Sequence, residues 1–256
     1  MDYNLHTHTK RCGHASGEDE EYILAAIDAG IKTLGFSDHA PYLFPDGREQ
    51  GHCVKTKDAE EYVRNILSLK KKYEDKIDIR VGFEMEYYPT YFDGMLSYVK
   101  SLGAEYLILG QHAIYDGKYF VHGVKESAED YREYVRCTVS AMRSGAFSYV
   151  AHPDIMQLSS DEEVFEEGAR EIARASREIN VPLEINLLGV REGRCYPTEK
   201  FWSIVGKEGS PVTVGIDAHS PSAILEKEAF SVAKWLIKKW QLNYVGMAKI
   251  RNLNQI

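Results

Sequence analysis

Short apolar runs alternate with longer segments of helical periodicity along the chain. The short runs are rich in β-branched residues, whereas the longer segments carry apolar residues at i, i+3 and i+4. This alternation is typical of βα units that build a parallel sheet. Seven strands are predicted, at residues 3–5, 33–37, 77–83, 106–110, 148–151, 182–185 and 212–216. A helix is predicted after each strand, at residues 18–29, 57–73, 92–101, 127–144, 161–178, 198–206 and 222–239.

No linker rich in Pro, Gly or Ser, no low-complexity tract and no recurring repeat divides the sequence. We therefore expect one domain over residues 1–256. Two topologies fit the order of elements, a closed βα barrel and an open doubly wound sheet.

The composition indicates a globular protein with an excess of acidic groups. The 256 residues are 44% hydrophobic, and 31 Lys+Arg against 39 Asp+Glu give a net charge of -8. We therefore expect neither nucleic acid nor an anionic membrane as a partner. The longest uncharged apolar runs are about one strand long, far short of the roughly 20 residues of a membrane span.

Two further features favour a cytoplasmic location. The first residues lack the basic start and apolar stretch of a secretory signal. The four cysteines show no Cys-x-x-Cys spacing and are expected to be free thiols. Cys12 lies close to several histidines, and we expect it to be packed in the protein rather than to serve as a ligand or nucleophile.

Metal-capable side chains collect where the predicted strands end. In a closed βα barrel the carboxyl ends of the strands converge on one face, so residues from different strands can meet in one pocket. The strand-end residues are His6, Asp38, His39, Glu84, His112, His152, Asp217 and His219.

Two of these positions have a spacing that directs both side chains to one side of an extended segment. His6 and His8 stand at i and i+2, and so do Asp217 and His219. Both members of such a pair can reach one ion at about 2.0 to 2.2 Å.

Glu84 and Glu86 also stand at i and i+2. A carboxylate can bridge two cations, and Glu84, which directly follows the predicted strand, is the expected bridge. Glu86 is open to three interpretations: support of a ligand, contact with the substrate, or exposure as a surface acid.

The remaining histidines differ in their context. His14 lies on the loop after the first strand, close enough in sequence to His6 and His8 to join the ligands. His52 and His122 lie in loops outside the strand-end pattern and are not expected to be ligands. Nitrogen and oxygen donors without thiolates favour Zn, Mn or Fe, and so many ligands indicate two to three ions.

In strand order and over nearly the whole chain, these ligand motifs resemble the polymerase and histidinol phosphatase (PHP) superfamily. Four further motifs resemble its monofunctional histidinol-phosphate phosphatase branch: Cys-Gly-His-Ala-Ser at 12–16, Ser-Asp-His-Ala-Pro at 37–41, Asn-Leu-Leu-Gly-Val-Arg at 186–191 and Tyr-Pro at 196–197. The resemblance implies a distorted TIM-like (β/α)7 barrel with a trinuclear metal centre.

The resemblance also implies three ligand sets and an activity. One ion would take His6, His8, Glu84 and Asp217, a second Glu84, His112 and His152, and a third His14, His39 and His219. Asp38 would orient a ligand. A hydroxide bridging two ions would attack a phosphate monoester, with histidinol phosphate as the implied substrate.

Other residues are candidates for contact with the substrate. Arg191 follows the sixth strand, which carries no predicted ligand, and its planar guanidinium suits a bidentate grip on phosphate; Arg194 is a second candidate. Asp217, His219 or a metal-held water could protonate the leaving alcohol. Acidic and aromatic groups that suit an amine and an imidazole are Glu86, Tyr87, Tyr115 and Phe120.

Four alternatives stay open. The amidohydrolase pattern also begins with His-x-His, but His112 on the fourth strand and the additional His219 argue against it. A metal-binding module without turnover is disfavoured by the complete ligand set. A nucleic-acid-processing PHP domain is disfavoured by the net charge of -8. The same metal centre could also hydrolyse another small phosphate ester, because the choice of substrate rests on the resemblance more than on the residues.

Overall fold

A parallel sheet of eight strands forms the centre of the computed structural model, which describes residues 1–121, 127–158 and 160–255. The strand order is β1-β2-β3-β4-β7-β8-β9-β10, and neighbouring strands are parallel throughout. All seven predicted strands are present: β1 (Tyr3–Asn4), β2 (Thr33–His39), β3 (Asp78–Met85), β4 (Tyr106–Leu109), β7 (Phe147–Val150), β8 (Leu183–Asn186) and β9 (Pro211–Gly215). The short β10 (Asn243–Tyr244) was not predicted.

The sheet curls until its first and penultimate strands, β1 and β9, meet. Just beyond both strands, Thr7 and Ala218 form a parallel bridge, in which His8 N donates to Ala218 O at 2.9 Å. At the opposite end, β10 pairs with the start of β9, and the hydroxyls of Tyr3 and Tyr244 lie 3.0 Å apart. The prediction of a distorted barrel is confirmed, and the open doubly wound alternative is wrong.

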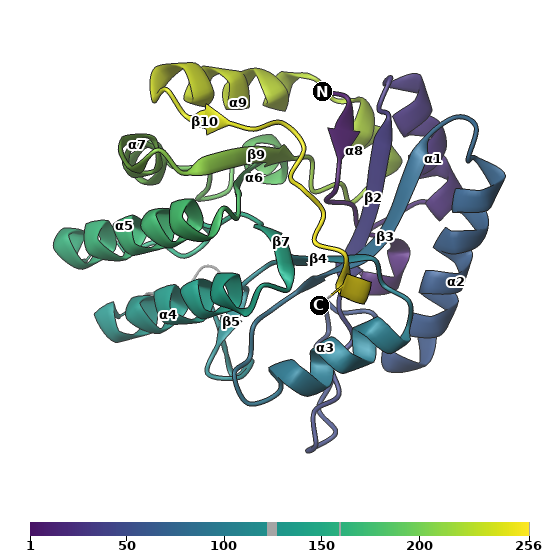
Figure 1. The fold of residues 1–256 in the computed structure, drawn as a ribbon, viewed down its shortest axis with the longest axis horizontal. Coiled ribbons are helices and arrows are strands. Elements are labelled where there is room, and N and C mark those ends of the chain that lie inside the picture. Colours follow the sequence, from purple (N-terminus) through teal and green to yellow (C-terminus); the bar gives the residue numbers. More distant parts are fainter. Residues whose placement is uncertain (122–126, 159, 256) are drawn as a thin grey trace.

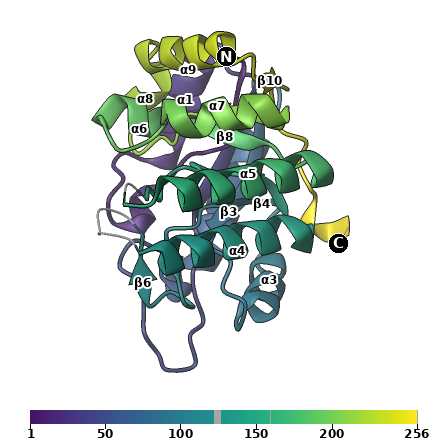
Figure 2. The ribbon, with the colours of Figure 1, turned by 90° about the vertical axis from the view of Figure 1, so that its left-hand side faces the viewer.

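Helices cover the outside of this sheet (Figure 1). The seven longer ones are α1 (Asp19–Asp28), α2 (Thr56–Lys72), α3 (Phe92–Ser101), α4 (Ala128–Ser144), α5 (Glu162–Ile179), α7 (Glu199–Glu208) and α9 (Glu228–Lys239). On one flank, α4, α5 and α7 pack side by side (Figure 2). Ser127, Asp161 and Thr198 cap these three helices, because each side chain accepts a hydrogen bond from a backbone N–H in the first turn.

One helix prediction is wrong, and two elements were missed. The segment 222–239 is not one helix: α8 (Pro221–Leu225) ends at Glu226, whose extended backbone separates it from α9. A short helix, α6 (Leu187–Glu192), follows β8 directly and was not predicted. An additional hairpin, β5 (Ala113–Ile114) with β6 (Tyr119–Phe120), follows β4.

Apolar side chains and the C-terminal segment fill the end of the barrel away from the ligand-bearing strand ends. Leu5, Tyr106, Ile108, Tyr149 and Ala151 cluster with Ala248 from the segment after β10. That segment crosses the starts of the strands, where Arg251 N donates to Ser148 Oγ and Leu253 N to Glu105 O. The metal-capable histidines therefore lie at the other end of the barrel, near the carboxyl ends of the strands.

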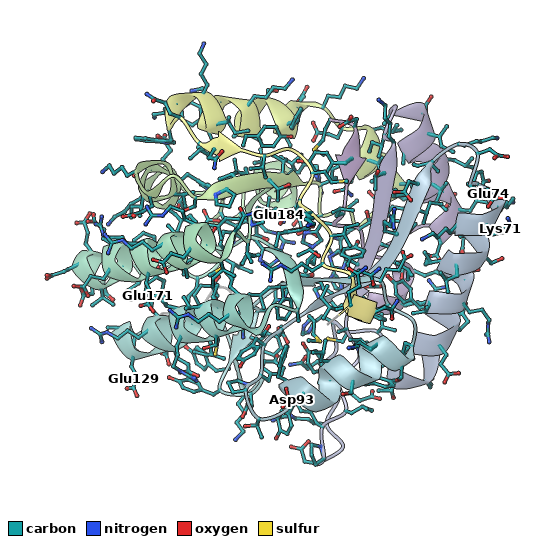
Figure 3. The ribbon with its side chains drawn as sticks, viewed as in Figure 1. Lys71, Glu74, Asp93, Glu129, Glu171 and Glu184 are labelled. Carbon is teal, nitrogen blue, oxygen red and sulfur yellow. The ribbon has the colours of Figure 1, made fainter. Side chains whose placement is uncertain are left out.

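Charged side chains lie mainly on the outer helices. Figure 3 shows Lys71, Glu74, Asp93, Glu129 and Glu171 at the rim of the molecule, whereas Glu184 lies in its interior. No helix in the described part of the chain combines the length and the apolar character that crossing a bilayer requires.

Candidate metal centre

The two i, i+2 pairs meet across the closure of the barrel. Because the Thr7–Ala218 bridge aligns the two segments, the residues on either side of Thr7 face those on either side of Ala218. The Nε2 atoms of His6 and His8 lie 3.2 Å apart. They lie 3.5 Å and 3.2 Å from Asp217 Oδ1, respectively.

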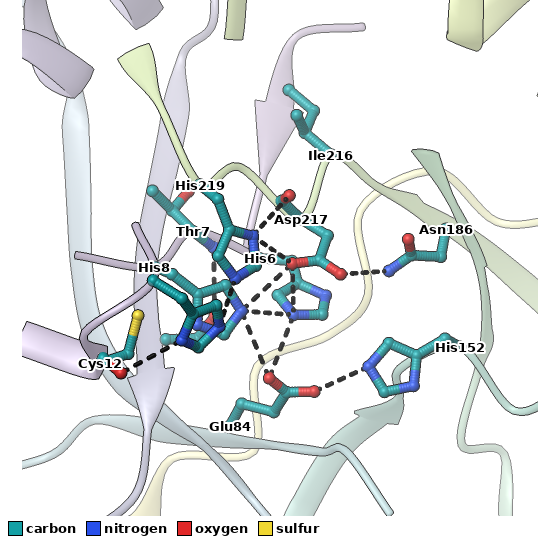
Figure 4. Close-up of polar contacts among 12 residues, drawn as sticks. His6, Thr7, His8, Cys12, Glu84, His152, Asn186, Ile216, Asp217 and His219 are labelled. Carbon is teal, nitrogen blue, oxygen red and sulfur yellow. Dashed lines mark hydrogen bonds and ion pairs between the residues drawn. The ribbon is translucent and has the colours of Figure 1, made fainter. Parts of the chain in front are cut away.

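Glu84 stands at the centre of the cluster, near the end of β3. Its Oε2 lies 3.4 Å from His6 Nε2 and 3.3 Å from His8 Nε2. Its Oε1 lies 2.9 Å from His152 Nε2 and 3.6 Å from His112 Nε2. The two oxygens thus face different groups of imidazoles, as Figure 4 shows for His152 on one side and His6 and His8 on the other.

The three histidines of the third implied set lie beside this group. The Nε2 atoms of His14 and His219 are 3.0 Å apart, and His39 Nδ1 lies 3.2 Å from Glu84 Oε2. The rings of His14 and His39 have centroids 5.4 Å apart. The four cysteines are free thiols, and that of Cys12 is buried and donates to Thr9 O.

The arrangement of these atoms fits bound divalent metal. Four ligands placed tetrahedrally at about 2.0 to 2.2 Å from one ion are about 3.3 to 3.6 Å from one another. The distances of 3.2 to 3.5 Å among His6, His8, Glu84 and Asp217 agree with this geometry. In addition, Glu84 Oε2 and Asp217 Oδ1 are buried and have no hydrogen-bond partner among the described residues, which a cation would supply.

A carboxylate stands behind three of the imidazoles. His6 Nδ1 lies 2.9 Å from Glu184, His8 Nδ1 lies 3.4 Å from Asp38, and His112 Nδ1 lies 3.4 Å from Glu86. An acceptor at Nδ1 favours the tautomer with its proton there and leaves Nε2 free to bind a metal. Asp38 therefore faces His8, although its sequence neighbour is His39.

Glu184 was not predicted from the sequence. It lies on β8, is fully buried, and accepts hydrogen bonds from His6 Nδ1, His152 N and Asn186 Nδ2. Asn186 also donates to Asp217 Oδ2 at 3.0 Å (Figure 4). The neighbouring strand carries Gly215, where a Cβ atom would stand 1.7 Å from Glu184 Oε1, so only glycine leaves room for this carboxylate.

The close packing of charges shifts the pKa values of the cluster. Burial by itself raises the pKa of Glu84, but the neighbouring histidines outweigh it and hold the pKa well below its usual range. Burial likewise opposes the shift at Asp217, where His6 and other histidines lower the pKa. Burial lowers the pKa of His8, but Asp217 and Asp38 raise it to about 9. For His219, burial and repulsion by His8 lower the pKa to about 3.

Of the two predicted arginines, only Arg191 lies differently from the prediction. Arg191 does not line the cavity above the cluster, because its Nη1 donates to Ile216 O at 2.9 Å and its Nη2 to Asp217 O at 3.0 Å. It thereby holds the backbone of Asp217, which has a positive φ of 52°. Arg194 does line the cavity, and its Nη1 donates to the hydroxyl of Tyr196.

Two predicted substrate residues also lie elsewhere. Glu86 is buried behind His112, and Tyr115 directs its hydroxyl to Asp130 on α4, so neither lines the cavity. His122 lies outside the described residues. The cavity has a volume of about 260 Å³, and its walls combine ligand-cluster residues with His52, Phe120, Leu188, Arg194 and Tyr196.

A distorted parallel barrel with a shared histidine and carboxylate cluster at its strand ends defines a class of barrel metalloenzymes. The chain belongs to the PHP domain family, whose match covers residues 4–187 and thus well over half of the chain. The family prediction is confirmed. The match ends before Asp217 and His219, so their place in the cluster comes from the structure.

Similar proteins agree with this assignment. A probable histidinol-phosphatase from Deinococcus radiodurans is 29% identical over 235 residues, covering 86% of each chain. A histidinol-phosphatase from Lactococcus lactis is 26% identical over 268 residues, covering 93% of this chain and 90% of that one. The crystal structure of a histidinol phosphate phosphatase from L. lactis, complexed with Zn, L-histidinol and phosphate, has a TM-score of 0.73 at 22% identity, with 95% of each chain covered.

Proposed function

We propose that the chain is a metal-dependent phosphomonoesterase that hydrolyses L-histidinol phosphate to L-histidinol and phosphate, a reaction of histidine biosynthesis. The observation that carries this proposal is the position of Glu84. Its two oxygens lie within 3.6 Å of imidazoles on opposite sides, as a carboxylate shared by two ions requires.

Three adjacent sets of side chains would hold the ions. In the first set, the separations of His6 and His8 from each other and from the two carboxylates are 3.2 to 3.5 Å. The second set shares Glu84 with the first, and the third lies beside His8. The donors are nitrogen and oxygen atoms, which suit Zn, Mn or Fe. The sets are His6, His8, Glu84 and Asp217; Glu84, His112 and His152; and His14, His39 and His219.

When bound, the ions would neutralise charge on the phosphoryl group and lower the pKa of an attacking water. The chain itself favours one tautomer of His6 and of His8, because Glu184 and Asp38 accept hydrogen bonds at their Nδ1 atoms. Arg194 brings a guanidinium to the cavity wall, where it can donate charge-assisted hydrogen bonds to phosphate oxygens. Asp217 and His219 also line the cavity, and together with a metal-held water they are the three candidates to protonate the leaving alcohol. The lowered pKa values of Asp217 and His219 favour the water.

Three observations support a small ester as the substrate. Two similar chains that match over most of their length bear the histidinol-phosphatase name. The cavity of about 260 Å³ is close to the lower end of the sizes found for small-molecule sites. The net charge of -8 opposes binding of a polyanion such as DNA.

Phosphate release from L-histidinol phosphate, glycerol phosphate and single-stranded DNA, measured side by side, tests the proposal. We expect the highest kcat/KM for L-histidinol phosphate, loss of activity with a chelator and recovery with Zn, Mn or Fe. Elemental analysis should find two to three ions per chain. A preference for DNA or for glycerol phosphate, or a content of one ion at most, would contradict the proposal.

A further inference from the structure

His14 is held by a turn rather than by a strand of the sheet. The short helix η1 (Lys10–Cys12) separates it from β1, whereas Glu84 lies within β3 and Asp217 follows β9 closely. Because His14 lies outside the sheet, its position depends on the contacts of this turn. We call residues 9–14 the His14 turn.

Hydrogen bonds within the His14 turn direct the imidazole toward the ligand cluster. Thr9 caps the turn, because its Oγ1 accepts a hydrogen bond from Arg11 N. Cys12 N donates to Thr9 O at 3.2 Å. His14 Nδ1 lies 3.1 Å from Cys12 O, and its Nε2 faces His219 Nε2 at 3.0 Å. A shift of the turn would therefore move this Nε2 atom away from His219.

Arg11 fastens the His14 turn to two outer helices. Its Nη1 donates to both carboxylate oxygens of Asp19, on α1, at 2.9 Å, and its Nη2 donates to Glu61 Oε1, on α2, at 3.1 Å. The side chains of Arg11 and Asp19 are 10% and 3% exposed, so this pair is buried, whereas Glu61 is 54% exposed. The same Nη1 lies 3.3 Å from Thr9 Oγ1, at the start of the turn.

A guanidinium suits this position better than any other cation. It is planar and carries five N–H donors, so it can contact two carboxylates and a hydroxyl at once, whereas lysine has its donors on a single nitrogen. Loss of Arg11 would leave the carboxylate of Asp19 buried without this cation, although Asn65 Nδ2 also donates to it at 2.6 Å.

The two ends of the His14 turn have supports of their own. Thr9 donates to Asp38 through both its backbone N and its Oγ1. Just beyond the turn, Ser16 N donates to His219 O at 2.9 Å. Without Arg11, the chain between Thr9 and Ser16 would stay attached at its ends and would gain freedom in between, where the imidazole stands.

We propose that Arg11 is a positioning residue that controls how tightly the third ligand set holds its ion. This set consists of His14, His39 and His219. The proposal rests on the function proposed above, in which three sets of side chains hold the ions. The other two sets should be unaffected, because their ligands lie within strands or shortly after them.

Dialysis of the zinc-loaded protein against buffers of decreasing free zinc, followed by elemental analysis, tests this role without measuring activity. We expect the wild type to hold three ions per chain at high free zinc. Arg11→Met should need about 10-fold more zinc to hold the third ion, with the first two retained as in the wild type. Arg11→Lys should restore the third ion only in part. His14→Ala serves as the reference for loss of the third set.

Two further variants complete the experiment. Lys10→Met is the matched control, because Lys10 is a cation on the same turn whose ion pair with Glu18 is exposed, and it should bind zinc as the wild type does. Glu61→Gln removes only the exposed carboxylate and leaves the buried pair of Arg11 and Asp19 intact, so folding is not at risk. It should weaken binding of the third ion about 2- to 5-fold.

The outcomes separate this role from the function on which it rests. Unchanged binding of the third ion in Arg11→Met and Glu61→Gln would overturn the proposal. So would a parallel loss of all three ions, which would mean that Arg11 merely supports the fold. If the wild type holds only two ions, the proposal fails while the proposed reaction stands. The expected loss of the third ion, without release of phosphate from L-histidinol phosphate by the wild type, would refute the reaction and keep the role of Arg11.

Discussion

Replacing Glu184 by Gln tests whether a carboxylate behind His6 controls the metal centre. The substitution keeps the shape of the side chain beside Gly215 and removes its negative charge. In the wild type, three donors point at this carboxylate: His6 Nδ1, His152 N and Asn186 Nδ2. A glutamine has only one acceptor oxygen, so its amide group must face at least one of these donors.

The size of the loss in metal affinity depends on which of the three donors no longer has an acceptor. Two of the three donors, His152 N and Asn186 Nδ2, converge on Oε2, so the glutamine oxygen is expected there. The amide NH₂ then faces His6 Nδ1 and favours the tautomer with a proton on Nε2, which cannot bind metal. Loss of such a supporting partner typically costs 10- to 100-fold in metal affinity, or about 1.4 to 2.7 kcal/mol.

The assay is a competition titration of zinc against a chelator, combined with the zinc concentration that restores half of the phosphatase activity. We expect both midpoints to move 10- to 100-fold in Glu184→Gln, with kcat close to wild type at saturating zinc. Glu171→Gln makes the same chemical change on the exposed face of α5 and should move neither midpoint (Figure 3). Unchanged zinc affinity in a folded Glu184→Gln protein would refute the argument.

Three further predictions follow from the same geometry. Glu84→Gln should lower kcat/KM by about 100-fold or more, whereas Glu86→Gln should lower it by about tenfold, because only Glu84 faces two groups of imidazoles. Equal losses in the two variants would contradict the assignment of Glu84 as the shared ligand. Arg191→Ala should lower both the zinc occupancy and kcat/KM, because the carbonyls of Ile216 and Asp217 lose their hydrogen-bond donors. Arg191→Lys should restore the zinc occupancy only in part. Full zinc occupancy with a roughly 30- to 1000-fold loss in kcat/KM would instead support a direct contact of Arg191 with phosphate. Zinc affinity should rise with pH up to about 9, because the pKa of His8 is about 9 and its proton competes with the metal below that value; an affinity independent of pH between about 6 and 9 would contradict the assignment of His8.

The order of elements left a closed barrel and an open sheet as alternatives, and the resemblance to the PHP superfamily favoured the barrel. The residues that meet at the end of the barrel could be predicted for a physical reason. Parallel strands bring their carboxyl ends to one face, so a list of strand-end side chains is already a list of neighbours. His6, Glu84, His112, His152 and Asp217 were identified in this way, and the structure brings their side chains together.

The residues that support the ligands were harder to predict. Glu184 lies inside the strand rather than after it, between the apolar residues Leu183 and Ile185. A carboxylate at a buried strand position needs a partner, so an acid within an apolar strand was a usable signal. The sequence holds no comparable signal for the contacts of Arg191 with Ile216 and Asp217. These contacts are made to backbone carbonyls, which every residue has.

Local patterns also could not show where elements are interrupted. The segment 222–239 has helical periodicity and contains neither Pro nor Gly, yet the chain leaves the helix at Glu226. The paired residues Asn243 and Tyr244 are exposed, so β10 has no apolar pattern to reveal it. Both features depend on how the end of the chain packs against the barrel.

The closure between β1 and β9 has a consequence for the order in which the molecule assembles. Tyr3 and Thr213, which contact each other at this closure, are 210 positions apart, and joining such distant points costs roughly 5 kcal/mol of chain entropy. His6 and His8 stand on one side of the closure and Asp217 on the other. During synthesis, the ligand set of His6, His8, Glu84 and Asp217 is therefore incomplete until β9 and Asp217 have emerged from the ribosome. An ion already bound to the other three ligands would then link the two ends of the sheet when Asp217 joins it, and this link would offset part of the entropic cost of closing the barrel.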